Sequence, residues 1–225
     1  MADAGFLLTV RVFYRKLGRM KYISHLDMNR CIARVLKRSG LPVWHTLGFN
    51  PHIYTTFALP LPLGFESTCE SLDFRLTREL PMQEVCDRLN AVLPEGLAVY
   101  RAQPAVNKPE VICWADYEIT QEFDQGDAAQ VARRFEEFCA KDVIEITKKG
   151  KKGERQMDIK PHFSVREVKA EGNTLAFTLL AAAGSTLNIN PMLLLDAFAA
   201  ESGLKADWLR IVRTAILDQN LQEFS

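Results

Sequence analysis

Long apolar runs, clustered cysteines and a leader-like start are all missing from this sequence of 225 residues. No apolar run approaches the ~18–20 residues that cross a bilayer, so we expect no membrane span. The first residues lack the basic segment that opens a signal peptide. The five cysteines lie far apart, which argues against a disulfide framework or a metal–thiolate cluster. We therefore expect reduced thiols, a cytoplasmic location, no bound metal and no cofactor.

The short motifs of common enzyme classes are missing as well. The sequence contains no Walker phosphate-binding loop, no G-x-G-x-x-G, no G-x-S-x-G and no H-E-x-x-H. Its four histidines are scattered along the chain. These absences favour an accessory or binding module without its own cofactor over a self-sufficient enzyme.

Charge is balanced overall but unevenly distributed. The 28 Lys and Arg equal the 28 Asp and Glu, yet residues 1–40 carry a net charge of +7 and the remainder carries −7. Residues 115–142 hold eight acidic side chains against three basic ones. Such segregation predicts a dipolar surface that attracts a polyanion on one side only.

The hydrophobic pattern predicts an α+β fold. In the first half, apolar alternation and helical periodicity predict strands at 6–14, 43–45, 53–59, 70–76 and 97–101, and helices at 25–39 and 81–92. In the second half they predict strands at 117–123, 143–147, 156–159, 163–169, 174–182 and 208–217, and helices at 127–141 and 190–202. We expect two ferredoxin-like (βαββαβ) units packed together, residues 1–104 and 111–225, joined near 103–110, the second with an extra β-hairpin.

The helix predicted at 25–39 combines a cap with a cationic stripe. Ser24 and Asp27 fit a capping box, although the pair could also belong to a functional site. Helical phasing places Arg30, Arg34 and Lys37 on one outward face. Such a face is often only solvated, but cations near exposed aromatic residues are typical of RNA binding. We expect a basic, strand-lined groove around residues 21–73.

The strings Lys21-Tyr-Ile-Ser-His-Leu-Asp-Met-Asn-Arg30, Gly48-Phe-Asn-Pro-His52 and Leu61-Pro-Leu-Gly-Phe-Glu-Ser67 resemble a radical-SAM-associated family of unknown function. The family is the domain of unknown function 2344, found alone or behind cobalamin-binding radical SAM enzymes. Later segments at 157–161, 188–191 and 213–217 match it too. The resemblance implies a radical SAM enzyme of the cobalamin-binding kind as partner, and a link to RNA metabolism.

Three functional hypotheses remain open. The first is an accessory protein that binds RNA, in tRNA or rRNA modification or processing, for a radical SAM enzyme. The second is a stand-alone enzyme using His25, Asp27, Asp73 and Asp158. The third is a protein–protein scaffold that docks through the acidic residues 115–142. The candidate RNA- or substrate-binding residues are Lys21, Ser24, His25, Arg30, Arg34, Lys37, Arg38, Phe49, Asn50, Pro51, His52, Lys149, Lys151, Lys152 and Arg155.

Overall fold

The computed structural model describes residues 7–124, 127–150 and 153–225. The chain divides into two compact units. The first unit ends at Val111 and also includes Phe224 and Ser225, and the second runs from Ile112 to Glu223. Both contain helices and antiparallel strands, so the α+β class expected from the pattern is confirmed. Within the described residues, no helix has the length and apolar character needed to cross a membrane.

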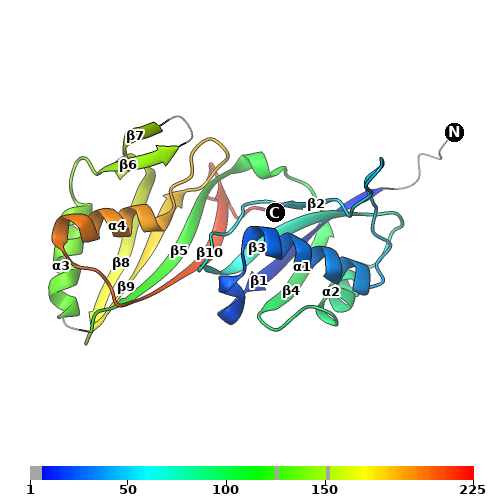
Figure 1. Cartoon of the computed structure of the whole chain (residues 1–225), viewed down its shortest axis with the longest axis horizontal. Coiled ribbons are helices and arrows are strands. Elements are labelled where there is room, and N and C mark those ends of the chain that lie inside the picture. Colours follow the sequence, from blue (N-terminus) through cyan, green and yellow to red (C-terminus); the bar gives the residue numbers. More distant parts are fainter. Residues whose placement is uncertain (1–6, 125–126, 151–152) are drawn as a thin grey trace. The chain divides into compact units, whose positions relative to one another are not determined.

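The first unit is a four-stranded antiparallel sheet with two helices (Figure 1). Its strands lie in the order β4-β1-β3-β2, and every neighbouring pair is antiparallel. The elements are β1 (Leu8–Lys16), a 3-10 turn η1 (Gly18–Tyr22), α1 (His25–Arg38), β2 (Thr55–Phe57), β3 (Glu66–Leu76), α2 (Met82–Asn90) and β4 (Leu97–Pro104).

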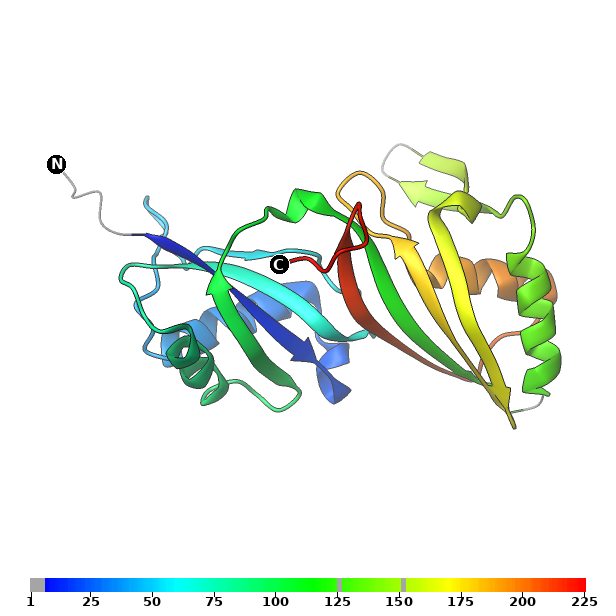
Figure 2. The ribbon, with the colours of Figure 1, turned by 180° about the vertical axis from the view of Figure 1, so that it is seen from behind.

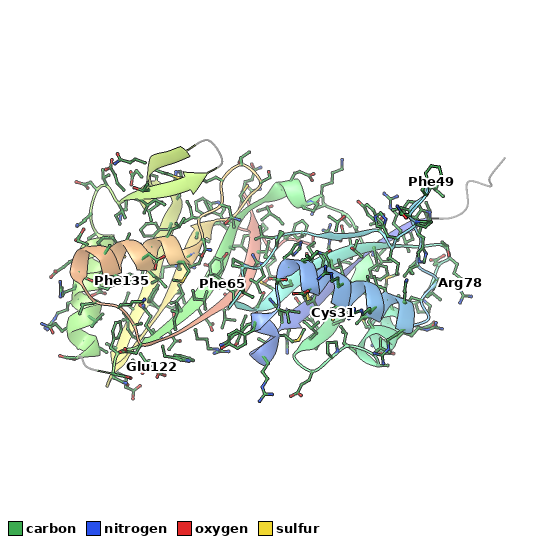
Figure 3. The ribbon with its side chains drawn as sticks, viewed as in Figure 1. Cys31, Phe49, Phe65, Arg78, Glu122 and Phe135 are labelled. Carbon is green, nitrogen blue, oxygen red and sulfur yellow. The ribbon has the colours of Figure 1, made fainter. Side chains whose placement is uncertain are left out.

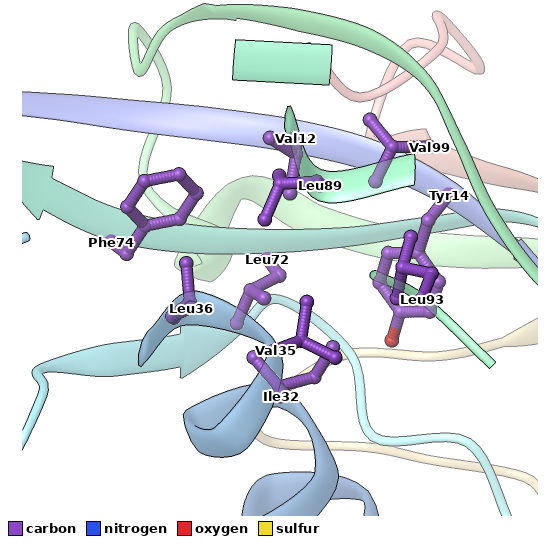
Figure 4. Close-up of a pocket in the computed structure, with 10 residues that line it drawn as sticks. All are labelled: Val12, Tyr14, Ile32, Val35, Leu36, Leu72, Phe74, Leu89, Leu93 and Val99. Atoms are coloured by element: carbon purple, nitrogen blue, oxygen red, sulfur yellow. The ribbon is translucent and has the colours of Figure 1, made fainter. Parts of the chain in front are cut away.

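Both helices cover the same face of this sheet. The apolar positions of β1 and β3 alternate, so one set of side chains meets the apolar stripes of α1 and α2. A space of about 10 Å³ lies within this core, room for at most one water molecule (Figure 4). This apolar pocket is therefore packing and not a ligand site.

The second unit repeats the same strand arrangement with a separate hairpin. Its sheet order is β10-β5-β9-β8, again antiparallel throughout, while β6 and β7 pair only with each other. Phe135 of α3 packs against Phe177 and Phe198, with ring centroids 4.6 and 5.2 Å away. The elements are β5 (Ile112–Glu122), α3 (Ala128–Cys139), β6 (Glu145–Gly150), β7 (Gly153–Asp158), β8 (Phe163–Glu171), β9 (Thr174–Ala182), α4 (Pro191–Ser202) and β10 (Trp208–Asp218), with 3-10 turns η2 (Pro109–Val111) and η3 (Lys160–His162).

The strand predictions between α1 and β3 were wrong in detail. Residues 43–45 form no strand and make only single bridges, Val43 to Leu76 and His45 to Ile53. The strand predicted at 53–59 is reduced to the three residues of β2. The physical reason is that the chain leaves the sheet after His45 and returns at Ile53, and the loop between them, residues 46–52, is closed by its own hydrogen bonds.

Candidate functional site

The N-terminus of α1 is tied together by its cap. The Ser24 hydroxyl accepts a hydrogen bond from the Asp27 backbone N–H at 3.1 Å and donates one to the Asp27 carboxylate at 2.7 Å. Arg30 donates to the same carboxylate at 3.1 Å. The Ser24 hydroxyl, and then Arg30, hold the pKa of Asp27 below its ordinary value. Asp27 is thus an ionised, engaged carboxylate, which is a poor general base near neutral pH.

A groove of about 560 Å³ runs along the outer side of α1. One wall carries Arg30, Arg34 and Arg38, spaced four residues apart, so that they stack one helical turn above another. The opposite wall is the loop at 91–94 that follows α2. Within the described part of the chain, no carboxylate pairs with Arg34 or Arg38. We name this feature the α1 groove.

The α1 groove differs from the expectation in two ways. Its walls are a helix and a loop, so the expected strand-lined groove was wrong about the elements involved. Lys37 is exposed on α1 but does not line the groove. The sequence did not indicate that residues 91–94 line the groove, because an uncharged Ala-Val-Leu-Pro segment is typical of an ordinary connecting loop.

Two of the segments that carry the family resemblance, residues 21–30 and 61–67, lie side by side at the start of α1. The Gly64 N–H donates to the Lys21 carbonyl at 2.8 Å, and the Lys21 ammonium lies 3.7 Å from the Glu66 carboxylate. His25 is exposed, with its ring edge-on to Phe57 at 5.1 Å and its Nε2 within 3.0 Å of the Asn29 amide. This cluster is polar and accessible, but the ammonium group of Lys21 is already paired with the carboxylate of Glu66.

The loop at 46–52 presents apolar side chains to solvent. The Thr46 N–H donates to the His52 carbonyl at 2.8 Å, and the His52 N–H donates to the Thr46 hydroxyl at 3.1 Å, which closes the loop. Phe49 at its tip is fully exposed, with Asn50 and Pro51 beside it (Figure 3). A closed loop that exposes an aromatic ring is suited to contact with a base or a partner protein.

The structure does not bring Asp73 to His25. Asp73 alternates with the core residues Leu72 and Phe74, so it lies on the face of the sheet opposite α1. There both of its carboxylate oxygens accept hydrogen bonds from buried Arg11, at 2.7 and 2.8 Å. His25 and Asp73 therefore share no cleft, and the carboxylate of Asp73 is occupied by an ion pair.

Asp158 belongs to the second unit and anchors the β6–β7 hairpin. One oxygen of its carboxylate accepts N–H groups from Ile144 at 2.9 Å and Lys160 at 3.0 Å. The Ile144 hydrogen bond, then that of Lys160, lower the pKa of Asp158. These contacts give Asp158 a structural role at the base of the hairpin.

The hairpin of the second unit is formed, but its backbone pairing extends beyond the strands predicted at 143–147 and 156–159. Lys149 is paired with Glu154 and Arg155 with Lys148 along the antiparallel backbone of β6 and β7. Lys151 and Lys152 lie outside the described residues.

Potential metal ligands are not clustered within residues 7–124, 127–150 and 153–225. In these ranges no three His, Cys, Asp or Glu side chains lie together in a way that could bind an ion. All five cysteines are free thiols. Burial raises the pKa of the Cys139 thiol to about 12, so this cysteine stays protonated at neutral pH.

Fold and site together define an α+β protein whose first unit carries an arginine-lined surface groove. The chain belongs to the bacterial family described as "Uncharacterized protein conserved in bacteria (DUF2344)", whose family model matches residues 9–191. No curated protein matches the sequence.

The chain is also similar to a solved structure, and this similarity concerns the fold alone. The chain is similar to one in the "Crystal Structure of a Cbf5-Nop10-Gar1 Complex", with a TM-score of 0.51 and 11% identity over 92% of this chain. It spans about half of that chain's length, 48%. A "Crystal Structure of an Unknown Protein from Galdieria sulphuraria" is matched at 10% identity, over 92% of this chain and 99% of the other, with a TM-score of 0.26, which is too low to bear on the fold.

Proposed function

We propose that this protein binds RNA through the α1 groove and presents it to a radical SAM enzyme as an accessory subunit. The observation that carries the RNA part is the row of Arg30, Arg34 and Arg38 along one open groove. Guanidinium groups bind phosphate oxygens in pairs of hydrogen bonds, so arginine is the residue expected at a phosphate-binding surface.

The spacing of the arginines favours a polymer over a single phosphate. Positions four residues apart on a helix are separated by about 6 Å along its axis, so the three guanidinium groups span roughly 12 Å. A single phosphate cannot contact all three, whereas successive phosphates of one strand can. Asp27 is the one carboxylate among the lining residues, and its charge is offset by Arg30.

Other surfaces are proposed to support the same role. The exposed Phe49 and its neighbours Asn50, Pro51 and His52 would contribute stacking and polar contacts. Lys149 and Arg155, with Lys151 and Lys152, would add phosphate contacts. The sheet orders β4-β1-β3-β2 and β10-β5-β9-β8 are the same when the strands of each sheet are counted along the chain, fourth-first-third-second. This order supports a ferredoxin-like assignment for both units. The free thiols support a cytoplasmic location.

The radical SAM partnership rests on the resemblance of the strings at 21–30, 48–52 and 61–67 to that family. One observation supports an accessory role. No charged side chain occurs from Ser39 to Phe65, and this stretch exposes Leu47 and Phe49. Exposed apolar anchors free of charge suit a protein interface. Pull-down of the enzyme before and after ribonuclease treatment separates direct contact from an RNA bridge.

The RNA proposal is tested by filter binding to total tRNA and rRNA at 50 and 200 mM salt. Arg34→Ala with Arg38→Ala is expected to weaken binding at low salt. Each phosphate contact with single-stranded RNA releases about 0.7 counterions on binding. Loss of two contacts should therefore make the slope of log affinity against log salt shallower by about 1.4. Arg78→Ala is the matched control, since Arg78 is an exposed arginine of the first unit that lies outside the groove. Binding that is indifferent to salt and to the double substitution would contradict the proposal.

A further inference from the structure

The face of the first unit's sheet that α1 and α2 leave uncovered carries arginines interleaved with aromatic rings. Figure 2 views the molecule from this side, with the strands in front of α1. We name it the helix-free face. Phe13 and Arg75 belong to it, because they alternate with core residues of β1 and β3. None of these residues was singled out by motif or periodicity in the sequence.

A β-bulge in β4 builds the first aromatic cluster. Phe13 pairs with Arg101 and Tyr14 with Val99, so Tyr100 is an extra residue in β4. A bulge of this kind lets two consecutive side chains project from one face. Tyr100 and Arg101 therefore both reach the helix-free face, where Tyr100 is 46% exposed and Arg101 is exposed.

These side chains form a column of planar groups. The guanidinium of Arg15 lies 5.5 Å from the ring centroid of Tyr100, and that of Arg101 lies 3.8 Å from the ring centroid of Phe13. The two rings are 6.3 Å apart. A pair of aromatic rings thus lies at the edge of the sheet with an exposed arginine at each end.

A second cluster of the same composition lies further along the sheet. Arg75 sits 5.2 Å from the ring of Trp44 and 4.6 Å from the ring of Tyr54. Arg75 pairs with Thr9, four residues before Phe13 on β1, so the two clusters are separated by about 13 Å.

The charge on this face is cationic. The carboxylate of Asp73 is directed to this face between the two clusters, and Arg11 occupies both of its oxygens. Among the described residues no carboxylate pairs with Arg15, Arg75 or Arg101. Each of these guanidinium groups packs on a ring instead, which leaves its charge available to an anion.

We infer that the helix-free face binds unpaired nucleotides of single-stranded RNA, with a base stacked against Tyr100 and the adjoining phosphate held by Arg15 and Arg101. Aromatic rings for bases beside cations for phosphates are the combination that single-strand binders use. An acidic peptide would engage the cations but would gain nothing from the rings. The inference deepens the proposed RNA binding and rests on it, but it places a second contact away from the α1 groove.

The test uses a fluorescein-labelled ten-nucleotide uridylate RNA, with inorganic polyphosphate as a polyanion that has no bases. Tyr100→Ala is expected to weaken RNA binding roughly five- to 150-fold, the effect of losing one stacked base, and to leave polyphosphate binding unchanged. Tyr100→Phe should bind RNA within about twofold of the unaltered protein. Tyr22→Ala removes an exposed tyrosine elsewhere and serves as the matched control. Thermal melting of each variant separates loss of binding from loss of fold.

The outcomes separate this inference from the proposed function. If only the α1 groove arginines matter and Tyr100→Ala binds RNA normally, the helix-free face is not a binding surface and the groove stands. If Tyr100→Ala and Arg101→Ala weaken RNA binding while Arg34→Ala with Arg38→Ala does not, the groove assignment fails and this one stands. Equal loss of RNA and polyphosphate binding in Tyr100→Ala would overturn the stacking role. A protein that binds no RNA overturns both.

Discussion

Arg11 shows how one buried charge is satisfied within the first unit. Its side chain is fully buried and gives two hydrogen bonds to Asp73. It also donates to the carbonyls of Asn107 at 2.8 Å and Ser225 at 3.0 Å, and packs under the ring of Phe224 at 4.2 Å. Arg11 thus joins β1 and β3 to two segments far away in the sequence. Asp73, which looked like a catalytic candidate beside the family motif, completes this network.

An unpaired buried charge is costly, so the Arg11–Asp73 pair can be tested by removing one partner. Asp73→Ala should lower the free energy of unfolding by about 3–5 kcal/mol, because it leaves the Arg11 guanidinium buried without its counterion. Urea unfolding followed by circular dichroism measures the loss. Arg11→Met combined with Asp73→Leu removes both charges and should be less destabilised than Asp73→Ala alone. A loss under about 1 kcal/mol for Asp73→Ala would show that the pair does not stabilise the fold.

At the scale of elements, η1 and the start of β4 meet at Gly96. The Leu17 N–H donates to the Gly96 carbonyl at 2.8 Å, and Gly96 has φ +87°. A Cβ built there would lie 2.6 Å from the Leu17 carbonyl oxygen and 2.7 Å from Cγ of Met20. The glycine is required by both its backbone conformation and this close approach.

Gly96 and Gly64 form a matched pair for a test at this scale. Both have φ +87°, but a Cβ at Gly64 would meet nothing within 4 Å. Gly64→Ala therefore reports the conformational strain alone, of order 1 kcal/mol. Gly96→Ala adds a backbone clash and should cost about 1–3 kcal/mol more. Equal unfolding midpoints in urea for the two variants would contradict the clash.

Elements were predictable from sequence where their determinants are local. The helix α1 was expected at 25–39 and found at His25–Arg38, because its Ser24 cap and its apolar stripe all lie within the segment. The strand at 174–182 was found as β9, Thr174–Ala182. The strand predicted at 43–45 was wrong because the conformation of this segment depends on Arg75, far later in the chain, against which Trp44 packs. The apolar–polar alternation within a short segment cannot indicate a contact with a residue so far away in the sequence.

At the scale of the whole molecule, the sequence located the cations but not the surfaces they form. Helical phasing placed Arg30 and Arg34 on one face, since helix geometry is fixed by local spacing. The second wall of the α1 groove comes from residues 91–94, and only the tertiary fold brings it there. The contact of Arg15 with Tyr100 depends on a bulge in β4 that no residue pattern marks.

The two units share one pH-dependent feature, a hydrogen-bonded carboxylate with a lowered pKa. Asp27 in the first unit is held below the ordinary Asp pKa of 3.8 by the Ser24 hydroxyl, and Asp158 in the second by the Ile144 N–H. In the unfolded chain both return to their ordinary pKa and bind protons more readily. Their stabilisation is therefore fully present above pH 3.8 and is lost as pH falls through the lower, folded-state pKa values.

The protein should be less stable at pH 3 than at pH 6, because the carboxylates of Asp27 and Asp158 have lowered pKa values in the folded state. Urea midpoints should fall across this range for the unaltered protein, and the fall should be smaller in Asp27→Asn with Asp158→Asn, which has no carboxylate to protonate at either position. An asparagine oxygen at position 158 can still accept both N–H groups, so the variant should retain its fold near neutral pH. Asp142→Asn is the control, an exposed carboxylate with no hydrogen bond among the described residues. Asp142→Asn should lose stability in acid as steeply as the unaltered protein. If the double variant does so too, the carboxylates of Asp27 and Asp158 do not couple folding to pH.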